Sequence, residues 1–81
     1  MMEPPIGYTT DEASGAMKNG TRVEKVYKEK NDYHPLGARA TVLGSLSHPT
    51  VGTGYFVEWD DMPGVPVFVV ARKIGAIGGV A

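Results

Sequence analysis

Residues 54–71 read GYFVEWD, then DMPG, then VPVFVVA, which are two runs of β-branched and aromatic residues around a Pro-Gly pair. Such residues suit the pleated, half-buried surface of a β-sheet. Pro63 has the fixed φ of the first central position of a type II turn, and Gly64 tolerates the positive φ of the second. The stretch therefore predicts a β-hairpin, and we expect the rest of the chain to pair with it.

The length and composition indicate one small β-rich domain. Of the 81 residues, 42 % are hydrophobic and 21 % are charged, which is typical of globular proteins. A chain of this size buries only about 60–65 % of its unfolded surface, so we expect a single core. The 11 glycines and 6 prolines favour many turns over long helices. The composition thus predicts an all-β fold.

Cysteine content, charge and the N-terminal residues bear on the surroundings of the protein. There is no cysteine, so disulfides and thiolate metal sites are not expected, and the chain suits a reducing cytoplasm. Residues 1–5 lack the basic and apolar regions of an export signal, and no apolar run reaches the about 18 residues of a membrane span. We therefore expect a cytoplasmic protein without a membrane partner. The formal net charge of −1 provides no general attraction for nucleic acid.

The segments before the hairpin supply its expected partners. Residues 21–27 and 38–46 read as two strands joined by a long loop, and Gly44 marks a bend in the second strand. Alternation along this strand places four residues on one face: Ala40, Val42, Gly44 and Leu46.

The two ends of the chain are less regular. Residues 1–19 read as an N-terminal extension, either one or two helical turns capped by Thr9 or Thr10 or an arm without fixed structure. After the hairpin, residues 71–74 read as a 3₁₀ turn, and residues 74–80 as a last short strand or a frayed tail.

Three short motifs resemble parts of the small barrels called SH3-like. They are Gly-Thr-Arg-Val at residues 20–23, Ala-Thr-Val-Leu-Gly at residues 40–44 and Gly-Tyr-Phe-Val-Glu-Trp at residues 54–59. The order of strand, long loop, bent strand, hairpin, 3₁₀ turn and final strand is also that of such barrels. The resemblance covers about residues 20–74. It implies a five-stranded SH3-like barrel over residues 20–81, preceded by the extension.

Among these barrels the chain is distantly similar to the plasmid-borne type II dihydrofolate reductases. That family shares the opening Gly-x-Arg-Val, a Gly-Tyr-x-Val-Glu strand, a Pro-Gly turn and a closing Arg/Lys-Ile element. The resemblance implies, as an alternative function, a homotetramer whose shared pore binds a nucleotide or a pterin, with Lys25 near a basic residue of the pore edge. The family's pore-lining Val-Gln-Ile-Tyr segment is replaced here by VPVFV at residues 65–69, and the chain has no Gln. We therefore expect a relationship of fold and not of reductase chemistry.

Aromatic side chains predict a ligand groove beside the long loop. Walls of this kind bind proline-rich peptides or small cationic or aromatic ligands through stacking and cation–π attraction. The predicted ligand-binding residues are Tyr27, Tyr33, Tyr55, Trp59 and Asp61. The favoured alternative is that Tyr55 and Trp59 are core residues that fill the barrel, because large aromatic side chains on a strand mostly pack inside.

The hairpin also predicts self-association. Tyr55, Val57 and Trp59 share one strand face, and if this face is the interior, an apolar patch remains outside. That patch, formed by Phe56, Phe68 and Val70, predicts the interface of a homo-oligomer. The alternative is that the N-terminal segment covers it through Ile6, Tyr8 and Met17.

No pattern in the sequence points to catalysis. His34 and His48 each precede a proline in a loop, and we expect both on the surface, outside any triad or zinc site. We expect no catalytic residue, no metal site and no cofactor. A basic edge suited to nucleic acid is a weaker alternative, formed by Arg22, Lys25, Lys28, Lys30, Arg39, Arg72 and Lys73. The main prediction is a non-catalytic binding and assembly module.

Overall fold

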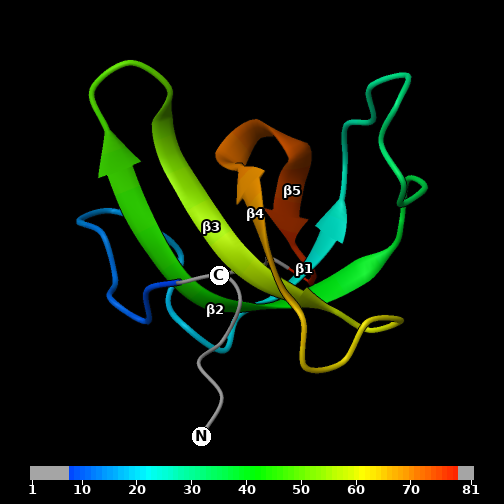
Figure 1. Ribbon diagram of the computed structural model, residues 1–81, viewed down its shortest axis with the longest axis horizontal. Helices are drawn as coiled ribbons and strands as arrows, with labels where there is room; N and C mark the ends of the chain where they lie inside the picture. The colour runs from blue at the N-terminus through cyan, green and yellow to red at the C-terminus, as the bar shows by residue number, and fades with distance from the viewer. Residues whose placement is uncertain (1–7, 79–81) are drawn as a thin grey trace, which may run out of the picture.

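Five antiparallel strands and one 3₁₀ turn form the regular structure of residues 8–78, the part of the chain that the computed structural model describes. They are β1 (Arg22–Lys25), β2 (Arg39–His48), β3 (Gly52–Trp59), β4 (Pro66–Val70), η1 (Ala71–Lys73) and β5 (Ile74–Ala76). The strands form one sheet in the order β4-β3-β2-β1-β5. In Figure 1, β2 and β3 are the two long curved strands that run side by side. The all-β prediction is confirmed.

The predicted hairpin is confirmed in its pairing and in its turn. β3 and β4 pair antiparallel, with Phe56 opposite Phe68 and Val57 opposite Val67. The Val65 N–H donates to the Met62 carbonyl at 3.2 Å, and Gly64 has a φ of +82°. A positive φ at this position is what a type II turn requires.

The core lies on one face of the sheet. In β3 the alternating residues Tyr55, Val57 and Trp59 are at most 4 % exposed, so this strand face is the interior. The other strands add four buried residues, Val23, Ala40, Val42 and Ile74. Val67 and Val69 of β4 pack against this cluster but stay partly exposed. The inner face of β4 is therefore the least covered side of the core.

A bulge in β2 confirms the predicted bend and changes which residues face inward. The register shifts between Val42 and Gly44, so that Val42 pairs with Val57 while Ser45 pairs with Tyr55. Two residues of one strand then oppose one of the other, and the alternation is reversed beyond the bulge. Ser45 consequently lies on the inner face, and Leu46, opposite Gly54, lies on the outer one. The expected placement of Leu46 with Ala40 and Val42 was wrong for this reason.

Residues 8–20 contain no helix; they follow an irregular path against β2 and β3. Thr9 does not cap a helix, since its Oγ1 accepts a hydrogen bond from the Asp11 N–H at 3.0 Å. The Ser45 N–H donates to the Asp11 carbonyl at 2.8 Å, and Ser45 Oγ accepts from the Ala13 N–H at 2.9 Å. The Met17 N–H donates to the Tyr55 hydroxyl at 2.9 Å. Ser45 is therefore buried with hydrogen-bond partners, as a buried polar group requires.

The end of the chain follows the predicted order. η1 comes directly after β4, and β5 then pairs antiparallel with β1, with Val23 opposite Ala76. Of the two predicted alternatives, a short strand or a frayed tail, residues 74–76 form the strand. Residues 79–81 lie outside the described residues. Within residues 8–78, none of the helical structure has the length and hydrophobicity needed to cross a membrane.

Candidate functional site

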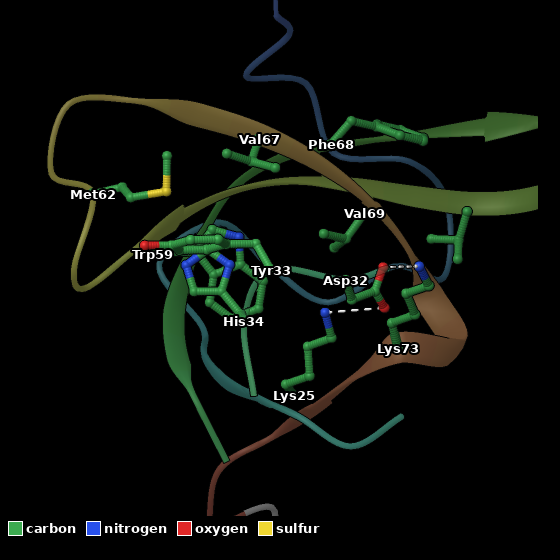
Figure 2. A pocket seen from close by; sticks show the side chains of 11 residues that line it. Lys25, Asp32, Tyr33, His34, Trp59, Met62, Val67, Phe68, Val69 and Lys73 are labelled. Carbon is green, nitrogen blue, oxygen red and sulfur yellow. Dashed lines mark hydrogen bonds and ion pairs between the residues drawn. The ribbon is translucent and has the colours of Figure 1, made fainter. Parts of the chain in front are cut away.

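A cavity of about 480 Å³ opens on the inner face of the sheet, between β4 and the loop that joins β1 to β2. The lining residues are Lys25 of β1, Asp32, Tyr33 and His34 of the loop, Trp59 of β3, Met62 of the hairpin turn, Val67, Phe68, Val69 and Val70 of β4, and Lys73 of η1. Figure 2 shows Val67 and Val69 on one side and the loop residues on the other. The volume lies within the range of small-ligand sites.

One end of the cavity is aromatic. The His34 ring stacks on Trp59 with 4.1 Å between ring centroids and 15° between planes. His34 Nε2 is hydrogen-bonded to Asp61 Oδ1 at 2.8 Å, which ties the loop to the hairpin turn. The Tyr33 ring meets His34 edge-on at 4.9 Å and is 80 % exposed. Trp59 Nε1 is buried without a hydrogen-bond partner in the described part of the chain.

The other end of the cavity is charged. Asp32 lies between two ammonium groups, with its Oδ2 3.2 Å from Lys25 Nζ and its Oδ1 3.0 Å from Lys73 Nζ. Figure 2 marks both contacts with dashed lines. Lys25 is only 6 % exposed, because it follows Val23 on the inward face of β1. Its Nζ lies 5.8 Å from the centre of the Trp59 ring, so the charged and aromatic ends adjoin.

The pairing around Asp32 changes two pKa values. The Glu29 backbone N–H, which donates to Asp32 Oδ2 at 2.9 Å, is the largest cause of a pKa of Asp32 well below its usual value. The Lys73 and Lys25 ammonium groups lower this pKa further. The hydrogen bond with Asp32 in turn raises the pKa of Lys73. Each group favours the ionised form of its partner, so both are charged at neutral pH.

The structure brings three of the five predicted ligand-binding residues together. Tyr33, Trp59 and Asp61 all contact His34. Tyr55 belongs to the core, is 4 % exposed and does not line the cavity. Tyr27 lies outside the cavity as well, with the Arg72 guanidinium 5.4 Å from its ring centre.

The three predicted interface residues lie as the alternation implied, with Phe56 and Phe68 paired on the outer face. Their rings meet at a tilted angle with 5.3 Å between centroids, and Phe68 is 42 % exposed. The alternative prediction was that the N-terminal segment covers this patch. Tyr8 of that segment does pack against it, since its ring centroid lies 5.9 Å from that of Phe56. Met17 instead packs against the core, and Ile6 lies outside the described residues. Val70 pairs with Gly54 and is half-buried.

Acidic partners accompany four of the seven basic residues of the predicted nucleic-acid edge. The Arg22 guanidinium donates a bidentate pair of hydrogen bonds to the Asp60 carboxylate at 2.6 and 2.8 Å. This pairing lowers the pKa of Asp60. Arg72 pairs with Glu29 at 2.7 Å. Lys25 and Lys73 share Asp32. These carboxylates offset much of the positive charge that a phosphate backbone would need.

His34 is the site residue that the sequence interpretation missed. It was expected on the surface, but it is only 7 % exposed, because Trp59 covers its ring and Asp61 binds its nitrogen. A histidine followed by proline in a polar loop carries no periodic signal, so only the folded chain reveals this burial. Lys25 did carry a signal, because it alternates with Val23 along a strand.

A search of residues 8–78 for metal-ligating side chains found no group of three or more that could hold an ion. Comparison of the chain with known protein families, with characterised proteins and with solved structures gave no match. Its function is therefore inferred from its own residues and their geometry.

Proposed function

We propose that this chain is a non-catalytic binding module with an SH3-like barrel, and that its ligand, a short peptide or a small aromatic molecule, occupies the cavity beside β4. The strand order, the long loop after β1 and the 3₁₀ turn before β5 support the SH3-like assignment. Fold alone does not define a function, so the binding role depends on the site.

The observation that carries the proposal is the cavity itself. The described residues leave a concave site of about 480 Å³ next to Trp59, Val67 and Val69. Apolar walls with a few convergent polar groups are the usual composition of a ligand site.

The proposal is tested by filling the cavity. We expect Val67→Phe, which adds a ring to the β4 wall, to abolish binding of the proline-rich peptides and small aromatic compounds that perturb the Trp59 fluorescence of the wild type. Trp59 is the only tryptophan, so its emission reports on this site alone. Val51→Phe is the matched control, because Val51 is exposed in the loop between β2 and β3 and does not line this cavity. Equal binding by Val67→Phe and the wild type would place the ligand elsewhere.

A second proposed role is self-association through the outer face. It is favoured by the exposed ring of Phe68, which forms with Phe56 and Tyr8 an apolar patch on that face. Such patches on small proteins often mark interfaces. The reductase-like tetramer remains an alternative form of this assembly, and titration with NADPH and dihydrofolate tests it.

A further inference from the structure

We propose that the cavity selects a carboxylate ligand in which a short linker joins the anionic group to an apolar or aromatic body. This rests on the proposed function, because it presumes that the cavity beside β4 is a binding site. Two features support the inference: the charged end has more hydrogen-bond donors than acceptors, and it lies close to the aromatic end.

The charged end has more donors than acceptors. Both oxygens of Asp32 are engaged, since they meet the Glu29 N–H, Lys73 and Lys25. Each lysine ammonium has three protons to donate. Among the residues of the described chain, the carboxylate within salt-bridge distance of Lys25 is that of Asp32, and Lys73 meets Asp32 and Glu29. Unused N–H bonds therefore remain for a ligand oxygen.

The wall of the cavity carries a net positive charge. Its lining includes two lysines and one carboxylate, Asp32. Glu29 does not line the cavity, and Arg72 at 2.7 Å offsets its charge. Asp61 does not line it either and is hydrogen-bonded to His34. One positive charge is thus left over, in a site whose partly buried position strengthens electrostatic attraction relative to water.

The short distance between the charged end and the aromatic end of the cavity favours a ligand with a short linker. Lys25 Nζ lies 5.8 Å from the centre of the Trp59 ring, and Val67 and Val69 form the apolar wall alongside. A ring against this wall and a carboxylate at the lysines are therefore separated by a short linker. 3-Phenylpropionate has this form, and its volume is well below that of the cavity.

The test compares three probes with one skeleton and different charge: 3-phenylpropionate, the neutral 3-phenylpropionamide and the cationic 3-phenylpropylamine. Their binding is measured by the fluorescence of Trp59, the only tryptophan. Because a hydrogen bond to a charged group is stronger than one to a neutral group, we expect the carboxylate to bind at least about tenfold more tightly than the amide. The amine should bind most weakly, since two ammonium groups repel it.

Two variants locate the effect. We expect Lys73→Met, and separately Lys25→Met, to lower the affinity for 3-phenylpropionate much more than the affinity for the amide, so that the preference for the carboxylate is lost. Lys30→Met is the matched control, because Lys30 is exposed in the loop between β1 and β2 and does not line the cavity. Should Lys25→Met unfold, Lys73→Met and the probe series on the wild type still decide the question.

Three outcomes would overturn the inference. Equal affinity for all three probes would show that the cavity does not discriminate between ligands by charge. The binding-module proposal would still stand in that case. Tightest binding of the amine would show that Asp32 selects cations. Absence of binding by every probe would also contradict the inference, and the Val67→Phe comparison with peptides would then judge the binding-module proposal separately.

Discussion

Asp32 is the residue on which the charged end of the cavity depends. It holds Lys25 and Lys73 in place and closes its own loop through the Glu29 N–H. Without this carboxylate, a lysine that is 6 % exposed would lose its counter-charge. An unpaired buried charge is costly, so Asp32 contributes to stability as well as to the shape of the site.

The lowered pKa of Asp32 predicts a pH-dependent contribution to stability. A carboxyl whose pKa is lower in the folded than in the unfolded chain stabilises the fold above its unfolded-state pKa of about 3.9. This contribution is lost as the pH falls from there through the folded-state pKa. We therefore expect Asp32→Asn to lower the free energy of unfolding near neutral pH, by an amount that shrinks as the pH drops below about 4.

Chemical denaturation over a range of pH measures this effect. Asp60→Asn is the control, because Asp60 pairs with Arg22 where both side chains are about half exposed, and solvent screens such a pair. The Asp60 variant should therefore show the smaller loss. A difference between Asp32→Asn and the wild type that stays constant down to strongly acid pH would contradict the prediction.

At the scale of the element, the bulge in β2 and the N-terminal segment depend on each other. The bulge places Gly44 on the outer face opposite Phe56, and the carbonyl oxygen of Thr9 occupies the space where a Cβ would stand. Only glycine allows the two backbones to approach this closely. The close approach of the segment before β1 to the sheet therefore depends on a glycine at position 44.

We expect Gly44→Ala to destabilise the chain by about 1–3 kcal/mol, the usual cost of a side chain forced into occupied space. The Ser45 amide, which donates to the Asp11 carbonyl, should also exchange its hydrogen faster as the segment is displaced. Denaturation and hydrogen exchange measure the two effects.

Gly75→Ala is the matched control, since a Cβ there would meet only a methyl group of Val26 at 3.3 Å. That exposed side chain can move aside. Equal losses in the two variants would show that contact with Thr9 is not what makes Gly44 necessary.

At the scale of the whole molecule, β4 is an end strand of the sheet with apolar residues on both faces. Its inner residues Val67 and Val69 line the cavity, and the Phe68 ring on its outer face covers Gly54 where a Cβ would stand. Within the described chain β4 pairs only with β3. An apolar end strand of this kind is a common surface for association.

We expect the wild-type chain to form an oligomer in solution, and Phe68→Asp to shift it toward the monomer, because a charge on the outer face opposes its burial. Light scattering at several concentrations measures the mass. Leu36→Asp is the control, since Leu36 is exposed in the loop between β1 and β2, on the cavity side of the sheet.

Phe68 also covers Gly54, so circular dichroism must show that Phe68→Asp is folded. If it is not, Phe68→Thr tests the same patch, because threonine suits a strand and replaces the apolar ring with a small polar side chain. A wild type that is monomeric at every concentration would contradict the proposed self-association.

Much of the fold followed from local patterns. The alternation in residues 55–59 showed which residues of β3 share a face, and Pro63 with Gly64 located the hairpin turn. The site was less accessible to prediction. Tyr33, Trp59 and Asp61 were named from their residue types and do gather, but the His34 ring that joins them was expected on the surface.

The sequence by itself determined the approximate positions of the strands, the hairpin and which residues of β3 share a face, because these depend on backbone preferences and on a period of two residues. Only the tertiary structure decided that Ser45 and not Gly44 faces inward, since one bulge reverses the alternation. It alone placed Asp32 between Lys25 and Lys73, which lie far apart along the chain. Ion pairs and stacked rings between distant segments leave no periodic trace, because their partners meet only when the sheet curves and the loop packs against it.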